Sequence, residues 1–387
     1  SRCANPVRAG CTGTTVVCRW RRCDDQKLQV GVPNRGPRHY GLRGQMRGQH
    51  MARCGGLDRM RVLRALIKSR GGAIGEYWRE VNLSGFPNGY NFGPRPNIVY
   101  AFGFWWACAQ HIAAGLTFAR IWKSADALTW TVAQDVFSQT GSFSCLSASF
   151  SDGFLIFTGH LTPADSFADY GFVILSQDGE NWNYEPQVGT DQIIKAAGSN
   201  GANFLALSQS GNLFRSTDFA NWTLLRGQVA SLAQGVGKFV CSEEPTDPSL
   251  SYSTNGLTWV PVSTFAGKLV RKVNFSGGKF WAQSLEAQKS LWWSDDGVAW
   301  YQATVPAAYT NGTNAAFSKV AYADGIWLLW FTKENFSQKG ALISTSGNAW
   351  QDVSELVPNI GTEEFSEGGP FFFAPYGYNP QTAYVSP

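Results

Sequence analysis

The 387-residue sequence has few charged residues, few histidines and methionines, and no long apolar run. Charged residues make up 16% of it, and it holds 4 His and 3 Met. No apolar stretch reaches the roughly 18 residues of a transmembrane helix, and the opening Ser-Arg-Cys-Ala-Asn-Pro has no apolar signal core, so we expect neither a membrane span nor an intact secretion signal. Abundant instead are 16 Trp, 26 Phe, 13 Tyr and 42 Gly. This composition favours aromatic strands joined by tight turns over a helical bundle.

Charge divides the chain near residue 75. Residues 1–75 carry 14 Arg and 2 Lys against 3 Asp, a net charge of +13, whereas residues 76–387 carry 16 basic against 25 acidic side chains, a net charge of −9. The first segment has no Phe and one Trp, too few large apolar groups for a core of ordinary size. We therefore expect a basic, cysteine-containing N-terminal arm over residues 1–75 and a separate domain over residues 76–387.

The N-terminal arm holds five of the eight cysteines, without CxxC spacing. The sequence is therefore consistent both with disulfides and with free thiols. Its arginines suit an acidic protein surface, and we favour a docking arm. Nucleic acid is a less favoured partner because only Trp20 and Tyr40 offer rings for stacking on bases. A flexible basic tail is one alternative, and out-of-frame translation of GC-rich DNA, which also enriches Arg, Gly and Cys, is another. We expect Cys108, Cys145 and Cys241 to be buried in strands.

A seven-residue pattern, here called a box, recurs six times: Ser-x-Asp/Asn/Ser, then a turn, then a Trp six positions after the Ser. Apolar alternating runs flank each box, which places it on a hairpin between two strands. We expect the Ser and Asp side chains to bind backbone N–H groups of the turn, Gly to take the positive-φ position, and Trp to pack beneath. The residues assigned this structural role are Ser124, Asp126, Trp130, Ser176, Asp178, Trp182, Ser216, Asp218, Trp222, Ser253, Asn255, Trp259, Ser294, Asp296, Trp300, Ser344 and Trp350.

A glycine turn precedes most boxes, as at residues 151–154, 235–239, 276–280 and 323–327. Each repeat therefore has four strands, with the glycine turn between strands 1 and 2 and the box between strands 3 and 4. From Trp78 through the box Trp residues the steps are 52, 52, 40, 37, 41 and 50 residues, which is typical of β-propeller blades. Residues 383–387 resemble an unpartnered strand 3, for which residues 76–81 supply strand 4. We predict an all-β, seven-bladed β-propeller, with six blades as the alternative, closed by pairing of its N- and C-terminal strands.

The boxes resemble those of the BNR or Asp-box family of β-propellers, which includes sialidases and noncatalytic bacterial and phage proteins. The resemblance covers roughly residues 76–387, and these boxes are one residue shorter than the family's Ser-x-Asp-x-Gly-x-x-Trp form. The resemblance implies that ligands meet the face opposite the boxes, where the longest loops, residues 82–97, 302–315, 353–366 and 374–382, neighbour one another in a closed ring. The predicted ligand-binding residues on these loops are Tyr90, Phe92, Arg95, Tyr309, Tyr376 and Tyr378. Their rings suit stacking on sugars or a protein hot spot, and the alternative is that such rings only close the blades.

Catalysis is an alternative to binding. Resemblance to sialidases implies an arginine triad, a Tyr–Glu nucleophile pair and an Asp acid, but residues 76–387 hold six Arg, of which Arg120 and Arg215 are predicted in strand 3 close to boxes. We expect no metal and no cofactor, since His111 and His160 are alone in their predicted loops and no phosphate-binding glycine motif occurs. The carboxylates open to a two-carboxylate glycosidase mechanism are Asp165, Asp169, Glu243, Glu244 and Glu286.

These patterns favour a noncatalytic recognition or structural propeller of a phage virion, a tail or fibre component at the virion surface or in an extracellular setting. Its expected partners are a host surface glycan or neighbouring virion proteins, with the arm docked to an acidic protein surface. A glycoside hydrolase or sialidase-like enzyme on the same propeller is one alternative, and a purely architectural tail or capsid component is another.

Overall fold

A computed structural model describes residues 79–82, 97–165, 168–189, 193–243, 249–284, 290–309, 316–333, 338–354, 372–375 and 382–386. The chain divides into two compact units, residues 1–52 and 53–387, and every described residue belongs to the second. The predicted arm and Trp78 therefore lie outside the described residues. Within the described ranges, no helix combines the length and apolarity needed to cross a bilayer.

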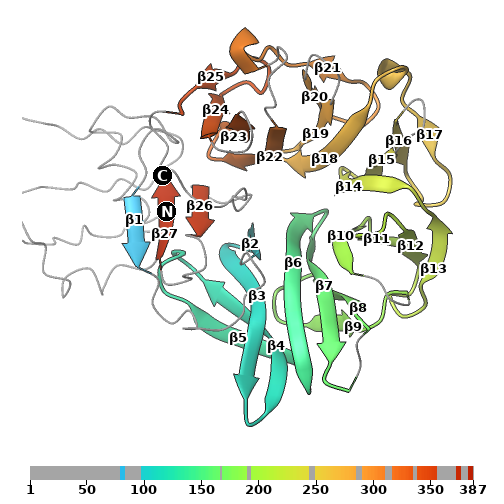
Figure 1. Ribbon diagram of the computed structural model, residues 1–387, viewed down its shortest axis with the longest axis vertical. Coiled ribbons are helices and arrows are strands. Elements are labelled where there is room, and N and C mark those ends of the chain that lie inside the picture. The colour runs from blue at the N-terminus through green and yellow to red at the C-terminus, as the bar shows by residue number, and fades with distance from the viewer. Residues whose placement is uncertain are drawn as a thin grey trace, which may run out of the picture. The chain divides into compact units, whose positions relative to one another are not determined.

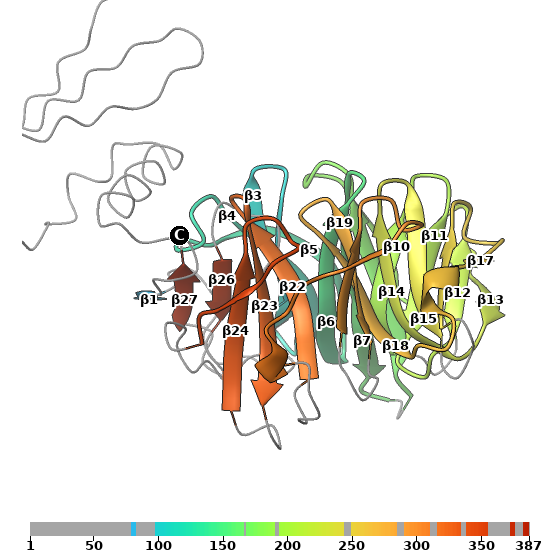
Figure 2. The same ribbon diagram turned by 90° about the horizontal axis from the view of Figure 1, so that it is seen from above.

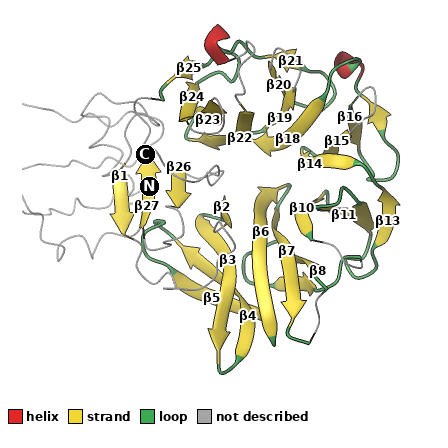
Figure 3. Ribbon diagram, viewed as in Figure 1, coloured by secondary structure: helices red, strands yellow, loops and turns green. Residues whose placement is uncertain are grey.

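Antiparallel strands make up nearly all of the described chain, with two short 3-10 turns, η2 (Ser263–Phe265) and η3 (Ala307–Tyr309) (Figure 3). Six sheets have four strands each, and in each of them consecutive strands pair. The first sheet contains β2 (Asn97–Ala101), β3 (Phe104–Ala113), β4 (Leu116–Ser124) and β5 (Thr131–Gln139). The second contains β6 (Gly141–Ser151), β7 (Phe154–Pro163), β8 (Tyr170–Ser176) and β9 (Trp182–Glu185).

The other four complete sheets repeat the same order with shorter outer strands. The third contains β10 (Ile194–Ser199), β11 (Phe204–Ser208), β12 (Leu213–Ser216) and β13 (Thr223–Arg226). The fourth contains β14 (Val229–Gly235), β15 (Lys238–Glu243), β16 (Leu250–Ser253) and β17 (Val260–Pro261). The fifth contains β18 (Val270–Ser276), β19 (Lys279–Ser284), β20 (Ser290–Ser294) and β21 (Tyr301–Gln302). The sixth contains β22 (Ala316–Ala323), β23 (Ile326–Lys333), β24 (Gln338–Ser344) and β25 (Gln351–Asp352).

A seventh sheet joins the two ends of the domain. It has the order β1-β27-β26, formed by β1 (Arg79–Asn82), β27 (Thr382–Ser386) and β26 (Phe372–Pro375). Arg79 pairs with Val385 and Asn82 with Thr382 in antiparallel register. The predicted pairing of N- and C-terminal strands is thus confirmed. Six blades have all four strands. The predicted count of seven blades is reached when this three-stranded sheet is included.

The first strands of successive sheets lie next to one another, in the order β2, β6, β10, β14, β18, β22 and β26 (Figure 1). Such a circular arrangement of sheets is a β-propeller. Strands run between two faces of the ring (Figure 2), so the 1–2 turns and the boxes share one face and the 2–3 and 4–1 loops share the other. We call the first of these the box face.

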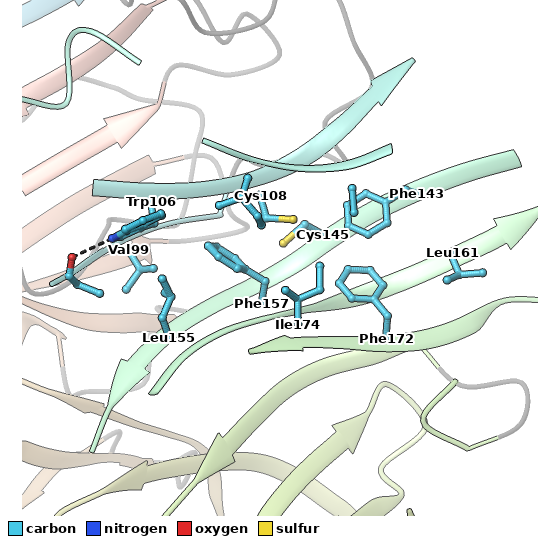
Figure 4. Close-up of a cluster of buried hydrophobic side chains, with 13 residues drawn as sticks. Val99, Trp106, Cys108, Phe143, Cys145, Leu155, Phe157, Leu161, Phe172 and Ile174 are labelled. Carbon is cyan, nitrogen blue, oxygen red and sulfur yellow. Dashed lines mark hydrogen bonds between the residues drawn. The ribbon is translucent and has the colours of Figure 1, made fainter. Parts of the chain in front are cut away.

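Hydrophobic side chains fill the space between neighbouring sheets. Figure 4 shows one such cluster between the first and second sheets, where Trp106, Phe143, Phe157 and Phe172 meet the thiols of Cys108 and Cys145. The Phe143 and Phe172 rings stack with centroids 4.5 Å apart. These two cysteines and Cys241 are buried in strands as predicted, and burial raises the pKa of the Cys241 thiol to about 12.

Candidate functional site

Each box forms the hairpin between strands 3 and 4 of its sheet, as the sequence predicts. The fifth sheet shows the bonding: the buried Ser294 Oγ accepts from Gly297 N at 2.8 Å and donates to Asp296 Oδ1 at 3.0 Å. Asp296 Oδ1 also accepts from the backbone N–H groups of Val298 and Ala299 at 2.8 and 2.9 Å. The polar groups of the box are thereby bound within their own turn.

Hydrogen-bond donors of the turn surround the carboxylates of Asp178 and Asp218. Hydrogen bonds, chiefly from the Asn181 backbone N–H and side chain, hold the pKa of Asp178 well below its ordinary value. The pKa of Asp218 is lowered in the same way by the Asn221 side chain and backbone N–H. A carboxylate bound this way is a poor general acid at neutral pH.

The Trp and Gly positions of the boxes also follow the prediction, with one correction. Trp130 and Trp300 are buried, and their Nε1 groups donate to the carbonyls of Ala127 and Gly297, both at 3.1 Å. Glycine holds the positive-φ position in four boxes, but Ala127 (φ 58°) and Phe219 (φ 68°) hold it in the other two. The turn therefore imposes left-handed backbone even where the residue has a Cβ.

The predicted ligand-binding residues fall mostly outside the described ranges: Tyr90, Phe92, Arg95, Tyr376 and Tyr378 all do. Tyr309 is described, and it is 4% exposed. Its ring lies 4.5 Å from that of Phe331 and its hydroxyl donates to Asp352, which with burial raises the pKa of Tyr309 to about 12. In this position the ring closes the sixth sheet and presents no face to a ligand.

The described arginines considered for an anion-binding triad make contacts in different parts of the ring. Arg120 binds Asp135 through two hydrogen bonds of 2.5 and 2.7 Å, and Arg215 binds Asn203 Oδ1 at 2.5 and 3.1 Å. Arg226 forms an ion pair with Glu243 at 2.7 Å. These three guanidinium groups therefore do not converge.

The loops predicted to hold His111 and His160 begin later than expected, because the strands before them continue further. His111 lies in β3 and His160 lies in β7, and the candidate carboxylate Glu243 lies in β15. Burial lowers the pKa of His160, opposed by Asp169, whose Oδ1 accepts from Thr162 Oγ1 at 2.5 Å. Glu244 and Glu286 lie outside the described residues, and no group of three metal-ligating side chains occurs among those described.

A cavity of about 210 Å³ lies where the first strands of five sheets meet, and the sequence analysis did not propose it. Its lining comes from β6, β10, β14, β18 and β22, and includes three lysines and no Asp or Glu among the described residues. Ser147, Lys195, Ser231, Lys272 and Lys319 occupy equivalent positions, each four residues before the last residue of its strand. We call these five residues the channel layer.

β-Bulges accompany the channel layer. Pairing between strands 1 and 2 shifts register between Cys145 and Ser147, between Ile194 and Ala196, and at the matching place in β14, β18 and β22. The pairing of β2 with β3 shows no such shift, and β2 does not line the cavity. A β-bulge changes the direction in which nearby side chains point. These bulges lie at the level where the five sheets contribute side chains to the cavity.

Gln234 and Ser151, which also line the cavity, are hydrogen-bonded to each other. Gln234 of β14 packs over β10, where a Cβ added to Gly198 would lie 2.6 Å from Gln234 Cβ. The Gln234 amide accepts from Ser151 Oγ and donates to Asp152, which also accepts from Gly237 N at 2.6 Å. These bonds tie β14 to the 1–2 turn of the second sheet.

Comparison with known proteins finds similarity to solved structures only. No protein-family model and no curated protein matches the sequence. Solved structures of similar fold include YCF48 bound to D1 peptide, with a TM-score of 0.47 and 16% identity over 80% of this chain and 94% of that chain. A GH74 xyloglucanase from Xanthomonas campestris has a TM-score of 0.44 and 17% identity over 71% of this chain and 46% of its own. An α-L-arabinanase from Penicillium chrysogenum, complexed with arabinobiose, has a TM-score of 0.41 and 11% identity over 79% and 96%.

These solved structures belong to proteins of different activities. At such low identities the similarity concerns the β-propeller fold and transfers no activity to this chain.

Proposed function

We propose that this protein is a noncatalytic recognition propeller of the Asp-box type, and that it acts at a virion surface by binding a host glycan or a neighbouring protein. The observation that carries the proposal is the division of polar groups between its two faces. The box side chains bind their own turns, whereas lysine and serine side chains from five sheets line one shared cavity. A cavity that several sheets share is a place to bind a ligand.

The state of the candidate carboxylates supports binding over hydrolysis. A glycosidase of the usual kind needs two carboxyl groups about 5–10 Å apart beside the sugar. Glu243 is ion-paired with Arg226 and accepts from Ser251 Oγ at 2.8 Å, and Asp169 accepts from Thr162. The described lining of the cavity has no carboxylate at all. The described residues thus offer the cavity cationic and hydroxyl groups but no acid–base pair.

A glycan array with the full chain, run beside an assay for new reducing ends on every glycan retained, tests the proposal. We expect retention of a defined set of glycans with no release of product. Release of product from a retained glycan would replace recognition by a hydrolase. A protein that retains no glycan but assembles with other virion proteins would be an architectural component.

A further inference from the structure

The box of the fourth sheet differs from the others in one chemical group. Asn255 stands at the position where four boxes have Asp and the box of the sixth sheet has Ser346, and Gly256 follows it. Asn255 is exposed, whereas Ser253 and Gly256 are buried. An amide differs from a carboxylate because it can lose ammonia to a nucleophile. This box therefore holds a reactive bond that the carboxylate boxes do not have, the Cγ–Nδ2 bond of Asn255.

Hydrogen bonds polarise the Asn255 amide as an oxyanion hole polarises a carbonyl. Asn255 Oδ1 accepts from Leu257 N at 2.9 Å and from Thr258 N at 2.8 Å. The hydroxyl of Ser253 donates to the same oxygen at 3.2 Å. Donors held at one oxygen stabilise the negative charge that develops there when a nucleophile attacks the carbon. The turn thus activates Asn255 Cγ towards attack.

The backbone nitrogen of Gly256 is the nucleophile next to this carbon along the chain, and its attack on Asn255 Cγ closes a succinimide ring. Gly256 N donates to Ser253 Oγ at 2.9 Å, and this hydroxyl donates in turn to Asn255 Oδ1. Ser253 therefore connects the nitrogen that loses a proton with the oxygen that gains one, as a general acid–base group does. A glycine at this position, with φ of 67°, leaves the ring closure free of a Cβ.

We propose that Asn255 is a self-modification site, at which the box converts its own amide to a carboxylate. The bond between Gly256 N and Asn255 Cγ forms while the nitrogen passes its proton to Ser253 Oγ and Ser253 passes its own proton to Oδ1. The Cγ–Nδ2 bond then breaks, Nδ2 leaves as ammonia with the proton from Oδ1, and the carbonyl forms again in the succinimide. Water adds to Cγ, the bond from Cγ to nitrogen breaks, and the nitrogen regains a proton. The product at this position is an aspartate.

The same donors decide which carbonyl of the succinimide reacts with water. Attack at the main-chain carbonyl gives isoaspartate, in which the chain runs through Cγ, whereas attack at Cγ restores the ordinary chain. Leu257 N and Thr258 N polarise the Cγ carbonyl, so aspartate is the favoured product. It gives the fourth box the Ser-x-Asp form of the fifth, where Asp296 Oδ1 accepts two backbone N–H groups. This inference goes beyond the proposed function and does not depend on it.

Peptide mapping by mass spectrometry tests the proposal on the full chain during incubation at neutral pH, because replacing the amide by a carboxylate changes the peptide mass. We expect Asn255 to convert faster in the folded chain than in the same chain unfolded in urea, and mainly to aspartate. Asn200, which also precedes a glycine, is the internal reference: its Nδ2 donates to Thr254 O at 2.8 Å, which holds the leaving nitrogen, and it should convert more slowly. No conversion of Asn255 in the folded chain, or faster conversion after unfolding, would overturn the proposal.

Substitution of the serine separates an active turn from a protective one. S253A removes the proton relay and should slow conversion of Asn255 about tenfold or more, since general acid–base groups contribute roughly 10²–10⁴-fold. S294A removes the equivalent buried hydroxyl of the fifth box, so it matches the loss of stability and should leave the rate at Asn255 unchanged. A turn that only protects the amide would be loosened by S253A, and a higher rate in S253A would overturn the proposal.

Two further variants test the chemistry without altering the fourth box. D178N places an amide before Gly179, in a turn where Gly179 N donates to Ser176 Oγ at 2.8 Å and Ser176 Oγ donates to Oδ1 of residue 178 at 3.2 Å. It should return to aspartate during incubation. D218N places an amide before Phe219, whose Cβ hinders ring closure, and should stay an amide. Equal rates of conversion in D178N and D218N would overturn the proposal.

Discussion

The box turns and the channel layer both repeat once per sheet, but they use polar side chains in opposite ways. In a box, the hydrogen bonds of Ser294 and Asp296 described above all lie within their own turn. In the channel layer, Lys195, Lys272 and Lys319 each belong to a different sheet and share one cavity. The first arrangement stabilises the fold, and the second assembles chemistry that no single sheet has. Changes in boxes should therefore alter stability, and changes in the layer should alter binding.

The largest effect on stability should come from removing the Trp side chain that packs beneath a box. Trp300 is 6% exposed, and its ring lies 5.4 Å from that of Phe265. We expect W300A to lower the free energy of unfolding by about 3–5 kcal/mol, because it removes a buried aromatic side chain and leaves a cavity. Urea unfolding measures this, with Y301A as control, since the neighbouring Tyr301 is 54% exposed and should cost under about 1 kcal/mol. A similar cost for both variants would contradict the structural role of the box Trp.

Loss of a box hydroxyl should have a smaller effect. S294A removes the acceptor of the Gly297 N–H inside a buried turn, and we expect a loss of about 1–3 kcal/mol for the group left unsatisfied. D295A serves as control because the Asp295 side chain is 66% exposed, and its surface pair with Lys279 should contribute about 1 kcal/mol or less. Equal losses in S294A and D295A would contradict the structural role of the buried box hydroxyl.

Lowering the pH should weaken the boxes by protonating their carboxylates, whereas lysine side chains keep their charge. The pKa values of Asp178 and Asp218 are lowered in the fold, so their contribution is complete above the unfolded pKa of about 3.9 and is lost as pH falls below it towards the folded values. Stability should decline with acid below about pH 4. D178N/D218N should flatten that decline, because Asn accepts the same backbone bonds without titrating, as Asn255 does at 2.8 and 2.9 Å. Unfolding midpoints measured from pH 2 to 7 give the slope, and an unchanged slope would show that other carboxylates control it.

The smallest effect on stability should come from the box of the sixth sheet, which has Ser346 where the other boxes have Asp or Asn. Ser346 Oγ accepts from Asn348 N and Ala349 N at 3.2 and 3.4 Å, longer than the 2.8 and 2.9 Å that Asp296 makes in the neighbouring sheet. We expect S346D to raise the free energy of unfolding by up to about 1 kcal/mol, measured by urea unfolding. A lower melting temperature would mean that this turn is adapted to the shorter side chain.

Much of the fold was predictable because its signals are local. Ser, Asp, Gly and Trp within seven residues define a hairpin turn, and six copies at blade spacing define a propeller. The terminal pairing was predictable too, since β27 reads as a strand that lacks its neighbour. The ends of the strands were less predictable. Strands β3, β7 and β15 continue through His111, His160 and Glu243, because packing between sheets extends strand pairing past the residues that predict a turn.

The candidate site was harder to find, although it left a trace in the sequence. Lys-Ala-Ala-Gly-Ser at residues 195–199, Lys-Val-Asn-Phe-Ser at 272–276 and Lys-Val-Ala-Tyr-Ala at 319–323 all place Lys four residues before a turn. Strand alternation alone did not reveal it, because bulges shift the side chains at this level. Tyr309 is the opposite case. Its ring was predicted to bind a ligand from a loop, but it packs into the sixth sheet.

The sequence by itself determined the repeated hairpins, the order of strands and the closure of the ring, because each depends on residues close in the chain or on strand-edge complementarity. Only the tertiary structure decided that positions from Ser147 to Lys319 line one cavity. The physical reason is that a shared cavity depends on distances between sheets, which the circular packing of the first strands sets and no single repeat contains.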